Sequence, residues 1–453
     1  MKLVWFKITD LRLKDHPALK HAFKGKGKGD VILIFCFDPI FYQNMKFDNI
    51  KFGKFKMKFL YQSVINLYDN IKKNNGHLNI YFESPQEIIP KLVSKFNITS
   101  IYHILDTTSE ELKQINQIKK ILNNKVEIKE YWSNTLFHIN DLPFDVKNMP
   151  SIFTNFRKKL NLKLLREEEN LNLKKLKYSI NDIDNISKVN DANDNIKIKM
   201  VFEGGETSAW NRLKYYFYEK KLLSIYKKTR NGLVGKDYSS KFSPYLAFGN
   251  ISAKSIQLEI LNYEKSIEKN DSTYWLYFEL LWRDFFRFSS LKYGNKIFKV
   301  TGIKDKKINW RVNDSKTKEL FDKWKNGETG YPYIDANMIE LKETGFMSNR
   351  GRQMVASFLV KDLKIDWRMG AEYFESMLID YDVASNYGNW NYSAGIGADP
   401  REDRYFNVYK QASNYDKDCK FIFTWIPSLK VNNKFDVLNV KNLKNYYPKI
   451  ANI

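Results

Sequence analysis

Residues 1–135 alternate between short apolar runs and amphipathic segments, and this alternation restricts the possible folds more than any other feature of the chain. The apolar runs are LVWFKI, VILIFCF, LNIYFES, ITSIYHI and VEIKEYW. Segments such as FLYQSVINLYDNIKK and QEIIPKLVSKF lie between them and carry apolar residues at the three- and four-residue spacing of a helix. Strands separated by helices predict a doubly wound parallel sheet, with any ligand at the carboxyl ends of the strands.

The pattern changes along the rest of the chain. Residues 136–200 are rich in Lys, Asn, Asp and Glu, which favours a long surface connector over a further core. From residue 201 onward the apolar spacing is helical, and residues 431–453 form a short basic tail. We therefore expect an α/β domain over residues 1–135, a connector, and then an all-α domain over residues 201–430.

The composition is strongly basic. Lys and Arg number 75 against 52 Asp and Glu, a net charge of +23 that favours attraction to nucleic acid. A generally Lys-rich composition without a specific partner is the alternative. No apolar run reaches the roughly 18 residues of a membrane span, and the first strand-like run is not a signal peptide. Cys36 and Cys419 suggest neither a disulfide framework nor a thiolate metal site, so we expect a cytoplasmic monomer.

The histidines are confined to the first third of the chain. They are His16, His21, His77, His103 and His138. The C-terminal half therefore works without imidazole as a base or metal ligand, and we predict no metal site there. Redox chemistry carried by a bound organic cofactor is consistent with this absence.

Residues 324–405 place charged and amide side chains within apolar segments of helical period. Arg352 lies near the start of a helix predicted over residues 346–363, where a cation opposes the helix dipole, so we expect it to pair with an anion or a carboxylate elsewhere. Asp380 and Asp382 follow, among several aromatic residues and amides. This composition is typical of a ligand pocket, although a capped helix end followed by a Gly-rich loop is an equal alternative.

A hydroxyl-rich run precedes Pro244, which suits the first turn of a helix. The run consists of Ser239, Ser240, Lys241, Phe242 and Ser243. Hydroxyls, an ammonium group and free backbone N–H groups at a helix start can cradle a phosphate, and the alternative is a simple Ser-capped helix.

One helix face farther along carries both aromatic and charged side chains. Its members are Trp275, Glu279, Trp282, Arg283 and Phe286. The alternative is an aromatic core stripe that contains an i,i+4 pair between Glu279 and Arg283. Against that alternative, burying an unpaired charge is costly, and the helix offers exposed positions that could have held both charges.

The chain resembles a known family over residues 202–427. The segments TGYPYIDANM, TGFMSNRGRQMVASFLVKDL, DWRMGAEYFE and DYDVASNYGNWNYSAGIGADPREDRYF are similar to the flavin-binding half of the photolyase/cryptochrome family. Within that family, GNWNY together with NRGRQ resembles the DASH-type cryptochromes.

This resemblance implies a non-covalent FAD in the helical domain. By resemblance the FAD-binding residues are Tyr226, Ser239, Ser240, Lys241, Phe242, Ser243, Arg283, Asn349, Arg352, Asp380, Asp382 and Asn386. Asn386 would face flavin N5, and Arg352 and Asp380 would form a salt bridge beside the ring. Trp390 and Trp367 match the first two members of an electron-donating chain, for which Trp310 is the favoured third member and Trp324 the other candidate.

The resemblance also implies a substrate and a reaction. Glu279 would hydrogen-bond a damaged pyrimidine, on which Trp282 would stack, and Gln353 and Tyr392 occupy DASH-like substrate positions. The expected activity is that of a deoxyribodipyrimidine photo-lyase, in which reduced FAD donates an electron to a cyclobutane pyrimidine dimer under light. Because Tyr392 replaces a second Trp, the smaller aromatic grip predicts a preference for single-stranded DNA, with RNA as a second candidate. A folate such as methenyltetrahydrofolate, or a deazaflavin, is the antenna known in such proteins.

Three other functions compete with this prediction. A (6-4) photolyase is disfavoured because it depends on active-site histidines. A blue-light photoreceptor whose flavin is photoreduced without repair shares the same motif residues and is the stronger rival. A non-catalytic nucleic-acid-binding module would give a colourless preparation.

Overall fold

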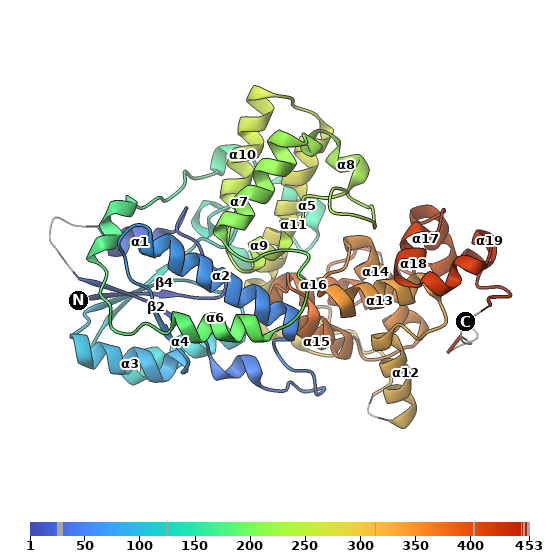
Figure 1. Ribbon diagram of the computed structural model, residues 1–453, viewed down its shortest axis with the longest axis horizontal. Coiled ribbons are helices and arrows are strands. Elements are labelled where there is room, and N and C mark those ends of the chain that lie inside the picture. The colour runs from blue at the N-terminus through green and yellow to red at the C-terminus, as the bar shows by residue number, and fades with distance from the viewer. Residues whose placement is uncertain are drawn as a thin grey trace.

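The computed structural model describes residues 1–24, 30–123, 125–312, 314–401, 404–444, 446 and 449–450. Parts of the predicted basic tail, namely residues 445, 447–448 and 451–453, lie outside the described residues. The sheet lies at one end of the molecule and the helical part at the other, with the C-terminus far from the sheet (Figure 1).

The described N-terminal residues form a five-stranded sheet in which every neighbouring pair is parallel. The strand order is β3-β2-β1-β4-β5, and the strands are β1 (Lys2–Phe6), β2 (Val31–Cys36), β3 (Asn79–Tyr81), β4 (Ser100–Ile104) and β5 (Glu127–Tyr131). Every residue of β2 is buried, which is why its sequence is apolar without strict alternation. The predicted doubly wound sheet is confirmed.

Helices cover both faces of this sheet (Figure 1). They are α1 (Pro17–Ala22), α2 (Lys54–Lys72), α3 (Pro85–Phe96) and α4 (Ser109–Leu122). Val4 and Phe6 point into the core that α1 and α2 share with the helical part, whereas Leu3 and Trp5 pack with α3 and α4. Successive residues of β1 therefore serve opposite faces, as the alternation of a strand requires.

From residue 201 onward the described chain is helical, as predicted, and α5 and α6 lie within the predicted connector. After the N-terminal part the helices are α5 (Phe153–Lys158), α6 (Ile186–Asn195), α7 (Glu206–Lys214), α8 (Tyr226–Thr229), α9 (Ser243–Ala247), α10 (Ala253–Ser266), α11 (Asp271–Tyr293), α12 (Ser315–Asn326), α13 (Pro332–Thr344), α14 (Asn349–Ser357), α15 (Trp367–Met377), α16 (Val383–Ser393), α17 (Val408–Tyr415), α18 (Lys420–Trp425) and α19 (Lys434–Asn439). The long helix α11 begins at a capping box formed by Asn270 and Thr273. It packs against both α8 and α16, so it is the element on which a site between these helices depends.

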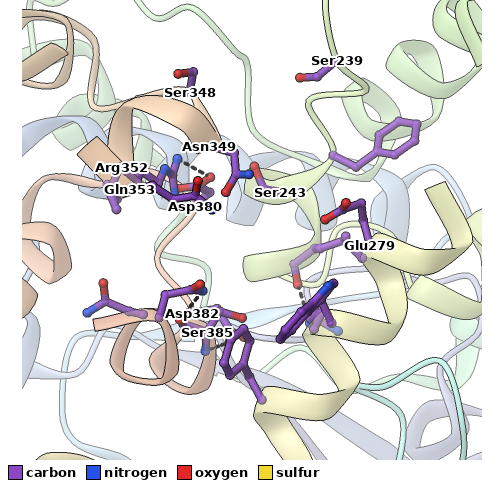
Figure 2. Close-up of a pocket in the computed structure, with 18 of the residues that line it drawn as sticks. Ser239, Ser243, Glu279, Ser348, Asn349, Arg352, Gln353, Asp380, Asp382 and Ser385 are labelled. Carbon is purple, nitrogen blue, oxygen red and sulfur yellow. Dashed lines mark hydrogen bonds and ion pairs between the residues drawn. The ribbon is translucent and has the colours of Figure 1, made fainter. Parts of the chain in front are cut away.

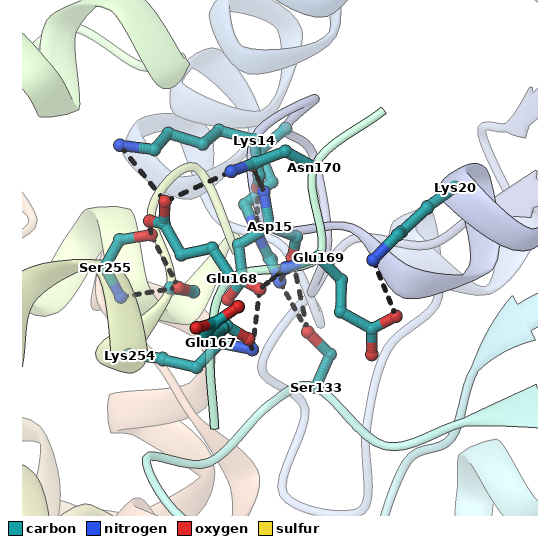
Figure 3. A network of polar contacts seen from close by, with 12 residues as sticks. Lys14, Asp15, Lys20, Ser133, Glu167, Glu168, Glu169, Asn170, Lys254 and Ser255 are labelled. Carbon is teal, nitrogen blue, oxygen red and sulfur yellow. Dashed lines mark hydrogen bonds and ion pairs between the residues drawn. The ribbon is translucent and has the colours of Figure 1, made fainter. Parts of the chain in front are cut away.

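Residues 136–200 run between the two parts and are tied to both. Glu169 N donates to Asp15 Oδ1 over 2.9 Å, and Asp15 N donates to Asn170 Oδ1 over 2.9 Å. Lys254 of α10 completes the network, with its Nζ 2.8 Å from Asp15 Oδ1 (Figure 3). A loop of the sheet domain, the connecting segment and a helix of the all-α part therefore meet at one carboxylate.

The two parts also contact each other directly. Gly249 has a φ of +60°, and a Cβ built there would lie 1.9 Å from Thr9 O. Arg12 crosses the same boundary, because its Nη1 donates to Gly249 O over 3.0 Å. Only glycine allows this close approach of the backbones.

In the described part of the chain, no helix has the length and apolar character needed to cross a bilayer.

Candidate functional site

A cavity of about 470 Å³ lies among α9, α11, α14 and α16 (Figure 2). The structure brings nearly all predicted site residues to its wall. They are Tyr226, Ser239, Ser240, Lys241, Phe242, Ser243, Glu279, Trp282, Arg283, Asn349, Arg352, Gln353, Asp380, Asp382, Asn386, Trp390 and Tyr392. Trp367 and Trp310, which were predicted to relay electrons, do not line it.

The hydroxyl-rich run leads into the first turn of α9 and is held by Arg212. The Arg212 guanidinium donates to Ser240 O over 2.9 Å and to Ser239 O over 3.0 Å. Lys241 has a left-handed backbone with a φ of +59°, and its Nζ lies 3.3 Å from the ring centroid of Tyr238. Burial lowers the pKa of Lys241, since the rings around it solvate an ammonium group poorly. A cavity that holds such a cation favours an anionic ligand.

Arg352 pairs with a carboxylate from a distant part of the sequence, as predicted. Its Nη2 lies 2.8 Å from Asp380 Oδ2, and its Nε donates to Met347 O over 2.9 Å. The other carboxylate oxygen, Asp380 Oδ1, is buried and has no hydrogen-bond partner among the described residues. Buried acceptors are nearly always satisfied in native proteins, so this oxygen is a candidate acceptor for a ligand donor.

Asp382 both caps α16 and forms a buried ion pair. It accepts a hydrogen bond from Ser385 N over 2.9 Å and pairs with Arg287 of α11. Burial opposes ionisation of Asp382, but the charges of Arg287 and Arg283 prevail and lower its pKa to about 2. Asp382 is therefore ionised at neutral pH. Sequence analysis missed Arg287, because helical spacing alone does not show which distant carboxylate a cation meets.

Glu279 does not pair with Arg283, so the alternative of an i,i+4 ion pair within α11 is wrong. Arg283 donates instead to Asn134 O over 2.6 Å and to Leu246 O over 3.1 Å. Glu279 pairs instead with Arg230, the residue directly after α8. Arg230 Nη1 lies 2.6 Å from Glu279 Oε1. Burial raises the pKa of Glu279, while Arg230 opposes that rise. Nothing in the sequence pattern pointed to Arg230.

Trp282, which was predicted to stack on the lesion, already stacks on a ring of the protein. Its ring stacks face to face on Phe153 of α5, with centroids 3.7 Å apart and planes inclined by 11°. The Tyr392 ring packs edge to face against Trp282, with ring centroids 6.4 Å apart. The Arg404 guanidinium lies 5.1 Å from the centroid of the Tyr392 ring. Gln353 accepts a hydrogen bond from Arg350 over 2.8 Å. One face of Trp282 is therefore occupied by the connecting segment.

Of the predicted electron-relay tryptophans, only Trp390 lines the cavity. Trp390 lines the cavity and packs against Gly370 of α15, the helix that begins at Trp367. The residue after Trp310 pairs with the strand-like segment before α15, because Arg311 N donates to Lys364 O over 2.7 Å. Trp324 contacts Trp390 with ring centroids 6.4 Å apart, but it is fully buried.

Asn386 is held in place by the backbone of α15. Its Nδ2 donates to Ala371 O over 3.0 Å. Its orientation therefore depends on the packing of α15 against α16.

Among the described residues, no group of His, Cys, Asp or Glu side chains could hold a metal ion.

Comparisons with known proteins agree with this geometry. Residues 2–174 match the family model described as DNA photolyase, and residues 275–447 match the FAD binding domain of DNA photolyase. The chain is 44% identical over 441 residues to the cryptochrome DASH of Synechocystis, covering 94% of this chain and 88% of that protein. The chain belongs to the photolyase/cryptochrome family, in its DASH branch. The cryptochrome DASH of Arabidopsis thaliana, named chloroplastic/mitochondrial, is 42% identical and covers 94% of this chain and 76% of its own length.

Solved structures of this family match the whole fold. The Synechocystis cryptochrome superposes with a TM-score of 0.87 at 42% identity, covering 96% of this chain and 90% of that one. An archaeal photolyase from Sulfolobus tokodaii, solved with two FAD molecules, superposes with a TM-score of 0.80 at 28% identity. That match covers 100% of this chain and 96% of the archaeal chain.

FAD is the cofactor of this DASH-type helical domain, and the side chains present fit it. The Lys241 ammonium suits a diphosphate. The unpartnered Asp380 Oδ1 suits a ligand N–H or O–H group, and the Arg352 guanidinium suits the negative charge of a reduced flavin ring.

Proposed function

We propose that this DASH cryptochrome is a light-driven deoxyribodipyrimidine photo-lyase that repairs cyclobutane pyrimidine dimers, with a preference for single-stranded DNA. The observation that carries the proposal is the position of Glu279. Its carboxylate faces the cavity from α11, on the side opposite Arg352 and Asp380 (Figure 2). A lesion against Glu279 and a flavin against Arg352 would therefore share one cavity, as direct electron transfer requires.

When bound, reduced FAD supplies the electron that splits the dimer under light and receives it back afterwards. The residues of the chain bind and orient. Arg230 fixes the Glu279 carboxylate at the cavity wall, where it can accept a hydrogen bond from a pyrimidine N–H group. Arg352 presents a fixed positive charge, and the Arg287–Asp382 pair anchors the start of α16.

We propose that electrons reach the oxidised cofactor through three tryptophans, passing from Trp310 to Trp367 and then to Trp390. The last member of such a chain must exchange electrons with a reductant in solution. Trp310 is partly exposed and adjoins the segment before Trp367, whereas Trp324 has no exposed surface. The difference in exposure supports Trp310 over Trp324 as the third member.

The preference for single strands rests on the cost of base flipping. Extruding a dimer from duplex costs a few kcal/mol, which contacts in the site must offset. Here one face of Trp282 is occupied by Phe153, and the nearby ring is the smaller Tyr392. A dimer in a single strand avoids the cost of unpairing. RNA is a second candidate substrate, attracted by the same positive charge.

We propose that a folate antenna occupies a second cavity at the carboxyl ends of the strands. That cavity measures about 840 Å³, and residues following β1, β2 and β4 line it together with residues of α15 and α16. Tyr381 and Asp382 line both cavities. An antenna at this place would lie one residue layer from the flavin.

The test is a repair assay on purified, chemically reduced protein under blue light. Dimer-containing oligonucleotides are supplied as single strands and as duplexes, and restored bases are quantified. We expect faster repair in single strands. Equal or faster repair in duplex would refute the preference. A protein that takes up FAD and is photoreduced, yet repairs neither form, would be a blue-light photoreceptor instead.

A further inference from the structure

The face of α11 that enters the cavity continues beyond it. Phe278, Glu279 and Trp282 line the cavity, whereas Trp275 lies about 10 Å before Trp282 along the helix, since each residue rises 1.5 Å. Trp275 is only partly buried. A large aromatic ring therefore lies next to the cavity on the same face as the residues predicted to hold the lesion.

The Trp275 ring is restrained by neighbouring aromatic rings. It stacks on Phe278 with centroids 4.9 Å apart and planes inclined by 29°. Phe278 in turn packs edge to face on Phe153 at 5.1 Å. This aromatic series extends without a gap to Trp282, through the Phe153–Trp282 stack. Restraint by neighbouring rings reduces the conformational entropy that an aromatic side chain loses on binding a base.

Two cations, Lys227 of α8 and Arg230 directly after it, lie near the Trp275 ring. Lys227 Nζ lies 4.9 Å from the ring centroid, and the Arg230 guanidinium carbon lies 5.3 Å from it. Arg230 is bound to Glu279 inside the cavity. Lys227 pairs with Asp271 over 2.8 Å, but the Asp271 side chain is 85% exposed, and such surface pairs contribute little. The Lys227 ammonium can therefore exchange Asp271 for a phosphate at small cost.

We propose that Trp275 and Lys227 form a subsite for the nucleotide next to the dimer. The Lys227 ammonium moves from the indole to the phosphate of that nucleotide, and the unpaired base stacks on the Trp275 indole in its place. Aromatic rings beside cations are the elements from which single-strand binding surfaces are built. A neighbouring base within duplex is already paired and cannot turn onto the indole. This inference rests on the proposed function, and it adds a second physical cause for the single-strand preference.

The experiment is equilibrium binding in the dark to the FAD-loaded protein. Each oligonucleotide carries one thymine dimer, and the adjacent nucleotide, on either its 5′ or its 3′ side, is a normal unpaired base or an abasic sugar-phosphate. For wild-type protein we expect about 5- to 20-fold tighter binding with the base present on one of the two sides, since stacking on an aromatic ring contributes at this level. W275L removes this base effect, and W275F retains part of it.

Lys227 is tested separately. K227Q is expected to keep the base effect but to lower the dependence of log Kd on log salt by about one unit, the share of one phosphate contact. A matched control is available in Trp210 of α7, which is also partly buried and lies under the ammonium of Lys14 at 4.0 Å. W210L should leave both the base effect and the salt dependence unchanged.

The outcomes separate the two proposals. If wild-type protein binds and repairs the dimer but shows no base effect on either side, or if W275L keeps the effect in full, the subsite is refuted while the photolyase function stands. If wild-type protein binds FAD but does not bind the dimer, the proposed function is refuted and the subsite with it. The FAD absorption spectrum of each variant reports whether the helical domain is intact.

Discussion

The ion pair between Arg287 and Asp382 permits the most direct test of the site's electrostatics. Both side chains are almost completely buried, with 5% and 8% exposure, and Asp382 starts the helix that carries Asn386 and Trp390. The perturbation is Arg287→Met, which retains the length of the side chain and removes its charge. Breaking one side of a buried pair leaves an uncompensated charge and costs about 3–5 kcal/mol.

The pKa of Asp382 gives an independent estimate. A fall from its ordinary value of 3.8 to about 2 corresponds to about 2 kcal/mol of folding stability at neutral pH. Because the folded-state pKa is depressed, this stability is present above about pH 4 and is lost as the pH falls toward 2. Without Arg287, burial is expected to raise the pKa of Asp382, so that the variant loses stability at pH 7 and is less sensitive to acid.

The assay is urea unfolding of wild-type and variant protein at fixed FAD concentration, followed by tryptophan fluorescence at pH 7 and pH 4. R287M should lose about 3–5 kcal/mol at pH 7, and the double variant R287M/D382N should recover part of that loss, because it buries no unpaired charge. K323M, which removes an exposed i,i+4 pair with Glu319, serves as the control and should leave the midpoint unchanged. A stability of R287M within about 1 kcal/mol of wild type would contradict the reasoning.

Further predictions concern the cofactor, the electron relay and the lesion. Lys241→Met should weaken FAD binding about 10- to 100-fold in a flavin fluorescence titration, since hydrogen bonds to charged groups contribute about 1.5–3 kcal/mol; an unchanged affinity would exclude Lys241 as a phosphate ligand. Trp390→Phe should abolish flavin photoreduction, followed by absorption, while chemically reduced protein still repairs dimers. Trp310→Phe should slow photoreduction and Trp324→Phe should not; the reverse result would make Trp324 the third member. Glu279→Gln should weaken dimer binding about 10-fold in an equilibrium titration, since it removes a charged hydrogen-bond acceptor that faces the cavity; an unchanged affinity would exclude Glu279 as a lesion contact.

Local sequence was sufficient for the architecture. A strand that is buried on both faces is apolar along its whole length, as in VILIFCF. Amphipathic helices between such strands lead to a parallel sheet, and this outcome does not depend on the side chains elsewhere in the chain. The motif segments of the C-terminal half also identified, one by one, the residues that the structure gathers around the cavity among α9, α11, α14 and α16. These residues lie close to one another in sequence within each motif, so the resemblance carried most of the site.

The sequence by itself showed that certain polar residues lie on the inward faces of helices, because the spacing of apolar residues indicates which face of a helix is buried. Only the tertiary structure decided which of them meet. Glu279 pairs with Arg230 and not with Arg283 four residues away, and Asp382 meets Arg287 from another helix. Phe153 of the connecting segment covers one face of Trp282. The physical reason is that an ion pair or a ring stack forms wherever helix packing brings two side chains within a few ångströms, and that packing is set by the whole core.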